Sequence, residues 1–312
     1  MENLRFVSKK NSDQYPLQAE NYLYNSSAYL QLKASRFAFL FTFYALKKNI
    51  AIARIHFFIK ESRSGEKEAI SLPESPFGSL EYRGELRKEN LTEFIHYIKA
   101  ELSAAKVKQV SIKDCINAYR AGSNLDLQEI LIQNNFKEES SLTNHHIAVD
   151  PLALEQKMHK MERKRLRKAR KAGFRFKEEP LSSLSYYYRF LQECRQEKGW
   201  HLSMSYADAL KSVQQLPEAY RIFAVYHGDE CIAASLSVVV NERILYDFYH
   251  DAKAAFKSWS PVVFLVEGIY QYCQQNGLRL LDLGTSQSTS LQLFKQHLGG
   301  IASYKNTYQL QL

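Results

Sequence analysis

Ten of the 42 lysine and arginine residues lie in one short segment of this 312-residue chain. Residues 158–177 (MHKMERKRLRKARKAGFRFK) hold these ten cations and one glutamate. The segment therefore carries +9, which equals the net charge of the whole chain. Charge that served only solubility would be spread over the surface. We therefore expect this segment to meet a partner with several negative charges, such as a phosphate-bearing donor or RNA.

Helical spacing of about 100° per residue divides this segment and the residues before it into two faces. The apolar face holds Leu154, Met158, Met161, Leu166, Ala169 and Ala172. Arg165 falls inside that face, so its side chain must extend to the surface or meet an acid or a ligand. A solvated helix docked by its apolar stripe is the alternative interpretation. The candidates for binding phosphates or substrate are Arg163, Lys164, Arg165 and Arg167.

A second candidate is the strand-like run 246–251 (YDFYHD). Strict alternation would place Asp247, Tyr249 and Asp251 on one face of a strand, and Tyr246, Phe248 and His250 on the other. Removing a proton from an attacking amine requires a carboxylate, imidazole or phenol within hydrogen-bond reach. We therefore predict Asp247 and Tyr249 as proton-transfer residues, the alternative being a strand with ordinary polar residues.

Other chemistries lack their sequence motifs. The chain contains no GxxxxGK[ST] or GxGxxG run for nucleotides and no Gly-x-Ser-x-Gly elbow for a serine hydrolase. His145, His146 and His159 have no carboxylate or thiol at a ligand spacing, so we expect no metal. Four scattered cysteines, no apolar run of about 18 residues and no apolar leader favour a cytoplasmic protein without a membrane span.

The elements that would position these residues occur in the same order in both halves of the chain. The first half predicts a hairpin over 37–44 and 52–59, a helix over 91–102, a strand over 107–112, a helix over 125–136 and a strand over 145–149. After the basic helix, the second half predicts a hairpin over 221–226 and 231–240, a strand over 244–250, a helix over 261–275, a strand over 278–283, a helix over 290–297 and a strand over 304–310. The fold class is therefore α/β (α+β), with domains at 1–150 and 151–312.

Three segments carry a resemblance to a known family. They are Arg163-x-x-Leu166-Arg167-Lys168-Ala169-x-Lys171-x-Gly173; Ser260-Pro261 followed by Gly277-Leu278 and 281–285 (LDLGT); and Phe294-Lys295 before Leu298-Gly299-Gly300. Through these three segments the chain resembles GNAT superfamily acyltransferases. Within that superfamily it resembles the branch of FemAB-type aminoacyltransferases and BioF2-like acetyltransferases. This resemblance implies two tandem GNAT-like domains, each a mixed, mostly antiparallel sheet flanked by helices. The first would be degenerate, and the second would hold the active cleft.

The resemblance also implies an activity, which is transfer of an activated acyl or aminoacyl group to an amine. Lys295 would stabilise charge at the reacting carbonyl, and Phe294 would line the donor pocket. The usual glycine-rich phosphate loop is missing from 251–261, so the donor phosphates would contact Lys257, Ser258 and Ser260 at a helix N-terminus. The donor would be acyl-CoA or aminoacyl-tRNA, and the amine acceptor could be a cell-wall precursor.

The competing hypothesis is a binding module without catalysis. A tandem GNAT-like protein that has lost turnover would bind RNA or another anionic partner through the basic helix 158–177. The missing glycine loop favours this alternative. The roles of two further acidic residues are also considered. Glu267 is either exposed or buried for a purpose. Asp282 could orient a base, but we expect it to cap the loop that follows its strand.

Overall fold

The computed structural model describes residues 4–11, 15–17, 21–34, 36–37, 39–82, 86–120 and 125–312. The chain forms two units: unit 1 is Met1–Leu142 with Tyr304–Leu312, and unit 2 is Thr143–Ser303. Both boundaries fall inside strands, β7 (Lys137–Ala148) and β13 (Ile301–Gln311), and each of these strands is given below with the unit that holds most of it. The predicted domain boundary assigns the last nine residues to the second domain. In the structure they group with unit 1 because the final strand pairs there, with Thr307 opposite Lys113.

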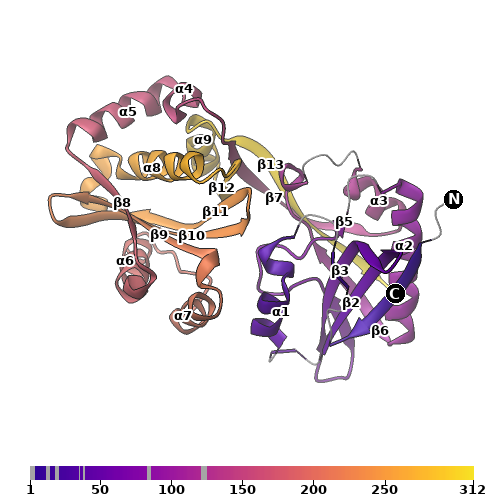
Figure 1. The fold of residues 1–312 in the computed structure, drawn as a ribbon. Helices are drawn as coiled ribbons and strands as arrows, with labels where there is room; N and C mark the ends of the chain where they lie inside the picture. The colour runs from indigo at the N-terminus through magenta and orange to yellow at the C-terminus, as the bar shows by residue number, and fades with distance from the viewer. Residues whose placement is uncertain are drawn as a thin grey trace. The chain divides into compact units, whose positions relative to one another are not determined.

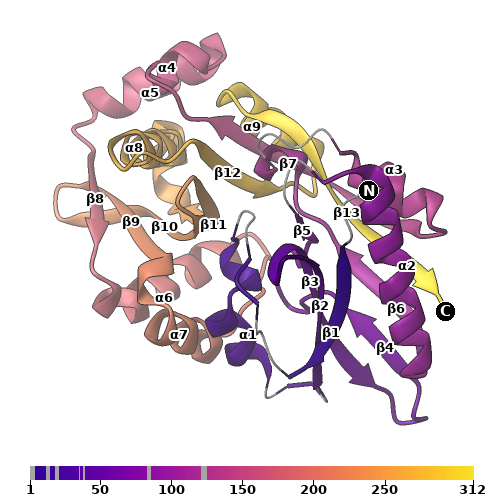
Figure 2. The same ribbon diagram turned by 45° about the vertical axis from the view of Figure 1, so that its right-hand side comes forward.

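Unit 1 is built on a sheet with the strand order β1-β2-β3-β4-β6-β13, and β5 pairs separately with β3. The predicted hairpin is present as β2 and β3, and its turn residues Lys48 and Asn49 both have positive φ, as a two-residue hairpin turn requires. Figures 1 and 2 show α2 and α3 on one face of this sheet and α1 beside the other. The elements of unit 1 are β1 (Arg5–Lys10), η1 (Leu23–Asn25), α1 (Ser27–Ala34), β2 (Phe39–Lys47), β3 (Ile50–Glu61), β4 (Lys67–Ile70), β5 (Glu81–Tyr82), α2 (Lys88–Ala104), β6 (Val107–Lys113), η2 (Asn117–Tyr119), α3 (Leu127–Gln133) and β13 (Ile301–Gln311).

In unit 2 the sheet has the strand order β7-β12-β11-β10-β9-β8. In Figure 1, α8 lies over one face of this sheet, and α6 and α7 lie on the other. The hydrophobic core under α8 is formed by side chains such as Leu245, Val266, Ile269 and Leu281. The elements of unit 2 are β7 (Lys137–Ala148), α4 (Leu154–Lys157), α5 (Lys160–Lys171), β8 (Arg175–Glu179), η3 (Leu181–Ser183), α6 (Leu184–Gln196), α7 (Tyr206–Gln215), η4 (Pro217–Ala219), β9 (Tyr220–His227), β10 (Glu230–Asn241), β11 (Ile244–Ala252), η5 (Ala254–Trp259), α8 (Pro261–Gln275), β12 (Leu280–Thr285) and α9 (Thr289–His297).

The mixed α/β class with mostly antiparallel strands is therefore confirmed. The described strand pairs in both units are antiparallel except β4 with β6 and β11 with β12. No helix in the described ranges is long and apolar enough to cross a membrane.

The parallel strands β11 and β12 separate soon after they meet. They pair only at Ile244–Leu280, Leu245–Leu281 and Tyr246–Asp282, although β11 continues to Ala252. Gly284, near the end of β12, has φ 74°, and a Cβ there would lie 3.1 Å from Cε2 of Tyr246. Glycine is therefore required both for the backbone conformation and for the Tyr246 ring that lies against it. The separation leaves the second half of β11 without a partner on this side among the described strands.

The basic helix is present as α5, but the residues before it form a separate short helix, α4. Helix α4 ends before Met158, and α5 begins after His159, so a single helical spacing does not extend across both. The prediction of a shared apolar face is wrong for Met161, which is 47% exposed. The side chain of Glu162 is buried in its place, because its Oε1 accepts a hydrogen bond from Arg165 Nη1 at 2.6 Å.

Candidate active site

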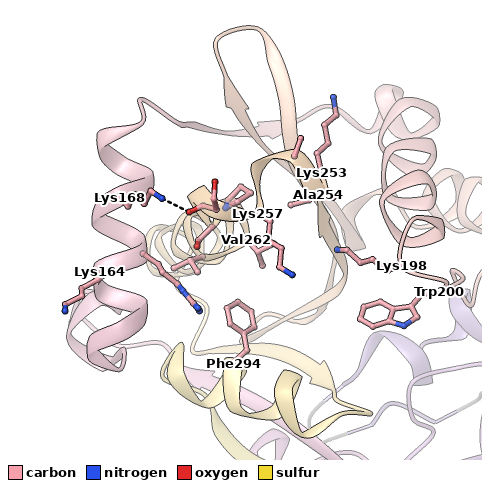
Figure 3. Close-up of a pocket in the computed structure, with 16 residues that line it drawn as sticks. Lys164, Lys168, Lys198, Trp200, Lys253, Ala254, Lys257, Val262 and Phe294 are labelled. Carbon is pink, nitrogen blue, oxygen red and sulfur yellow. Dashed lines mark hydrogen bonds between the residues drawn. The ribbon is translucent and has the colours of Figure 1, made fainter.

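A pocket of about 1240 Å³ lies within unit 2, at the start of α8. Helix α5, the segment after α6, η5 and α9 surround it (Figure 3). The structure brings together six of the predicted site residues in its lining: Lys164, Arg165, Lys257, Ser258, Ser260 and Phe294. In Figure 3 the ring of Phe294 and the side chain of Lys198 extend into the pocket, whereas Lys164 lies at the rim and extends away.

The lining of this pocket is strongly basic. Among the described residues it contains six cations and no acidic side chain; the cations are Lys164, Arg165, Lys168, Lys198, Lys253 and Lys257. Lys168 Nζ donates to the carbonyl of Ser258 at 2.8 Å, and Lys253 Nζ donates to Glu230 at 2.7 Å. Lys257 has no ion-pair or hydrogen-bond partner for its side chain within the described ranges. Three of the six cations are compensated, because Arg165 pairs with Glu162, Lys198 with Asp251 and Lys253 with Glu230. An anionic ligand would therefore meet positive charge chiefly from the other three, Lys164, Lys168 and Lys257.

The N-terminus of α8 opens into the same pocket. Ser260 is the N-cap and Pro261 the first helical residue, as predicted, but the Ser260 side chain makes no capping hydrogen bond. Ser260 adopts φ 55° and ψ 51°, a left-handed conformation that is uncommon for serine and costs about 1–3 kcal/mol. Pro261 has no N–H and the Val263 N–H donates to the Ser260 carbonyl at 3.0 Å, which leaves the Val262 N–H and the Ser260 hydroxyl for a ligand. Helix N-termini attract phosphates.

Two of the predicted phosphate-binding residues lie outside this pocket. Arg163 and Arg167 are not among its lining residues, and Arg167 Nε donates to Glu155 Oε1 at 2.9 Å. The neighbouring Arg170 pairs with Glu155 and with Glu267 of α8, whose carboxylate is nearly buried. Glu267 is therefore buried for a structural purpose, which is to fasten α5 to α8. Part of the charge of the basic helix serves its own attachment.

The strand β11 departs from regular alternation at its centre. Leu236 of β10 lies opposite Tyr249, but Val238 lies opposite Tyr246, so β11 has one extra residue between these pairs. Such a bulge changes the face to which the following side chains point. The prediction that Asp247 and Tyr249 share a face is therefore wrong. Asp247 instead shares its face with His250.

The two predicted proton-transfer residues consequently have different surroundings. The Tyr249 hydroxyl bonds to Ser203 Oγ at 2.6 Å and accepts from the Met204 N–H at 2.9 Å, so it fixes the segment between α6 and α7. Asp247 is fully buried, and its Oδ1 accepts from Ser235 Oγ at 2.6 Å. Its Oδ2 lies 2.6 Å from His250 Nδ1. The buried carboxylate and imidazole thus form a hydrogen-bonded pair.

Lys295 is held at the end of β12. Only 3% of the residue is exposed, and its Nζ donates to the carbonyls of Gly284 and Thr285, both at 2.9 Å. Its neighbour Phe294 lines the pocket, so α9 connects the pocket to the buried ammonium group. Asp282 accepts from the Gly284 N–H at 2.7 Å, which is the capping role expected for it.

These arrangements can be compared with known proteins. The profile of the acetyltransferase (GNAT) domain matches residues 156–305. This match covers most of unit 2. Solved structures are similar to most of the chain, and one of them is a tandem GNAT protein, although no curated protein matches the chain in sequence.

The crystal structure of FemX is similar over 95% of this chain and 94% of its own, with a TM-score of 0.72 and 13% identity. A tandem GNAT protein from the clavulanic acid biosynthesis pathway covers 99% and 98%, with a TM-score of 0.53 and 10% identity. The C-terminal domain of a putative lysylphosphatidylglycerol synthetase from Agrobacterium fabrum covers 83% and 81%, with a TM-score of 0.54 and 11% identity. The resemblance to the GNAT superfamily and its FemAB-type branch is thereby confirmed at the level of fold.

Sequence reasoning on this GNAT domain missed His250 and the pocket residues Lys198 and Trp200. A bulge has no reliable signal in one sequence, so the regular alternation misplaced His250. Lys198 and Trp200 follow α6 and approach the pocket only through the tertiary fold. The histidines considered for a metal do not form such a site: no cluster of three His, Cys, Asp or Glu side chains occurs in the part of the chain that the structure describes.

The hydrogen-bonded pair of Asp247 and His250 predicts how the stability of this domain depends on pH in acid. Burial by itself raises the pKa of Asp247, but the charge of His250, the hydrogen bonds from His250 and Ser235 and the charge of Lys295 together lower it below the ordinary 3.8. A lowered carboxyl pKa stabilises the fold above its ordinary value and loses that contribution as the pH falls through the folded-state value.

We therefore expect Asp247→Asn to differ from the wild type most at neutral pH and less below about pH 4. Urea unfolding across a pH series measures this difference in free energy. A difference that grows as the pH falls would contradict the lowered pKa of Asp247. Ser212→Ala is the control, because it removes a buried polar side chain on α7 that does not titrate.

Proposed function

We propose that this protein is an N-acyltransferase that takes an acyl group from a phosphate-bearing activated donor to an amine. The observation that carries the proposal is the pocket at the uncapped N-terminus of α8, whose lining has six cations and no acid among the described residues. The match of residues 156–305 to an acetyltransferase (GNAT) domain and the similarity to a tandem GNAT structure support acyl transfer.

The pocket residues fit a donor that carries phosphates. Lys257, Ser258 and Ser260 would hold the phosphates at the start of α8, with Arg165 and Lys164 approaching from α5. The apolar part of the lining, which includes Val263 and Phe294, would contact the chain that bears the acyl group. Lys295 would stabilise negative charge on the reacting carbonyl oxygen. Arg163 would meet a phosphate group only outside this pocket.

Between the two donor classes we propose acyl-CoA. The tandem GNAT protein of the clavulanic acid pathway is described in a form without AcCoA, which associates that protein with acetyl-CoA. Aminoacyl-tRNA is the alternative donor, and the same basic pocket would meet its terminal phosphates. The acceptor amine, including a cell-wall precursor, and a cytoplasmic location stay predictions.

The RNA-binding alternative without catalysis has less structural support. Arg167 and Arg170 of α5 pair with Glu155 of the same unit, which removes part of the charge that RNA would neutralise. Binding through α5 would show a steep dependence on salt.

A thermal-melt series with CoA and short acyl-CoAs tests the proposed donor. A ligand at about 100 times its Kd stabilises a protein by about 2.7 kcal/mol, so we expect a dose-dependent rise in Tm. Lys257→Glu should weaken this ligand by about ten-fold or more, because it places a carboxylate beside the phosphates.

The matched control is Lys171→Glu, which makes the same charge change on α5 outside the pocket lining. We expect it to leave the CoA-dependent shift nearly unchanged, since exposed charges are screened beyond about 8–10 Å. If no thioester raises the Tm, acyl-CoA is the wrong donor, and charged tRNA becomes the ligand to test. Equal losses in both variants would show nonspecific attraction.

A further inference from the structure

We propose that His250 is the general base of the transfer, with Asp247 as the residue that positions it. The inference rests on the proposed acyl transfer and identifies the group that removes the proton from the amine. It replaces the direct proton transfer to Asp247 that the sequence suggested. The geometry that points to it is the bulge in β11, which places both side chains on one face.

The hydrogen bonds fix the orientation of the imidazole. His250 Nδ1 lies 2.6 Å from Asp247 Oδ2, and the other carboxylate oxygen accepts from Ser235 Oγ at 2.6 Å. Ser235 Oγ is in turn 2.8 Å from Ser237 Oγ, so the carboxylate is held by a buried polar network. A carboxylate that accepts the Nδ1 proton leaves the lone pair of the imidazole on Nε2.

Asp247 and His250 differ in solvent exposure, and this difference indicates a different role for each. The Asp247 side chain has no exposed surface, whereas 18% of the His250 side chain is exposed. His250 Nε2 has no hydrogen-bond partner among the described residues. A buried carboxylate cannot meet an amine substrate directly, but the open nitrogen of the imidazole can. Asp247 therefore acts through His250.

The position of His250 along β11 connects it to the pocket. His250 pairs with Ser235 and Ala252 pairs with Ala233, so regular alternation resumes after the bulge and the two residues share a face. Two residues of extended strand span about 6–7 Å. Ala252 lines the basic pocket, and β11 has no partner from β12 at this level. A donor that enters from the pocket along this open edge brings its carbonyl toward Nε2.

The proposed step is a direct transfer. The amine nitrogen attacks the acyl carbonyl carbon, a C–N bond forms and the bond from that carbon to the leaving group breaks. The amine proton passes to His250 Nε2, and the leaving thiolate or alkoxide takes a proton from the imidazolium, which restores the neutral ring. No oxidant, reductant or further reactant is required.

The tautomer of His250 is the first test, and it requires no donor. In full-length protein labelled with ¹⁵N-histidine, at about pH 8, we expect an Nδ1–H and an unprotonated Nε2, with His250→Gln identifying the signals. Asp247→Asn should reverse this pattern, since an asparagine NH₂ can donate to Nδ1. A protonated Nε2 in the wild type, or the same tautomer in Asp247→Asn, would overturn the positioning by Asp247.

The second test asks whether His250 lies at the reacting centre. Diethyl pyrocarbonate labels unprotonated imidazole nitrogens, and mass spectrometry quantifies each histidine. We expect labelling of His250 to fall at least about ten-fold in Asp247→Asn, because the reversed tautomer protonates Nε2. Saturating acetyl-CoA should slow this labelling several-fold and leave the control His201, outside the pocket lining, unchanged.

The outcomes separate this inference from the proposed donor. If acetyl-CoA raises the Tm but does not protect His250, the donor is correct and His250 is out of reach, so the base assignment fails. If no thioester raises the Tm, the acyl-CoA proposal fails, and the same protection is measured with aminoacyl-tRNA. Absence of protection by that donor as well would overturn the base assignment.

Discussion

Replacing Lys295 by methionine is expected to lower acyl transfer by about 10²–10³-fold, the loss typical of removing one group that stabilises the oxyanion. The ammonium is nearly buried, so its charge is weakly screened by water. It donates to the carbonyls of Gly284 and Thr285 at the end of β12, close to the separation from β11. The rate of thiol release from acyl-CoA, with an amine that supports turnover, measures the effect.

The hydrogen bonds from Lys295 to these two carbonyls mean that Lys295→Met should also lower the stability of the fold. An exposed catalytic lysine could be removed with no change in Tm, but Lys295→Met also leaves two carbonyls without their charged donor. We expect a loss of about 1.5–3 kcal/mol for that reason. Lys295→Arg is the matched control, since it keeps the charge but not the compact geometry. Turnover of Lys295→Met at the wild-type rate in folded protein would show that the lysine is purely structural.

Helices and turns that are specified by neighbouring residues could be predicted from the sequence. The helix expected over 261–275 is observed as Pro261–Gln275, because proline marks its first turn and apolar residues recur at helical spacing along it. The turn of the first hairpin was equally clear, because three polar residues, Lys47–Lys48–Asn49, lie between two strand-like runs. Ser260 was placed correctly as N-cap, but its left-handed backbone and free hydroxyl depend on the tertiary fold.

The composition of the pocket was predictable only in part. The residues around Ser260 and Phe294 were found through the family resemblance, and the structure places them in one lining. The basic helix could not be divided from sequence into ligand-binding and structural cations. Arg167 and Arg170 face acids from other helices, and those partners are set by packing. The bulge in β11 likewise separated the faces of Asp247 and Tyr249.

A second large effect is expected in unit 1, where Arg54 and Glu81 form a buried ion pair. Their side chains are 5% and 0% exposed, and Arg54 Nη2 lies 2.7 Å from Glu81 Oε2. Glu81 Oε1 also accepts from the Tyr22 N–H at 3.0 Å, so the pair holds the segment before η1 against β3 and β5. Removing one partner of a buried pair costs about 3–5 kcal/mol, because the other charge stays buried.

We therefore expect Arg54→Met to lower the free energy of unfolding by about that amount, measured by urea denaturation. The double variant Arg54→Met with Glu81→Leu removes both charges, and it should recover much of the loss because no uncompensated carboxylate remains. An Arg54→Met effect below about 1 kcal/mol would instead place the pair among exposed ion pairs, which contribute little. The double-mutant cycle thus distinguishes the cost of a stranded charge from the loss of packing around Tyr22.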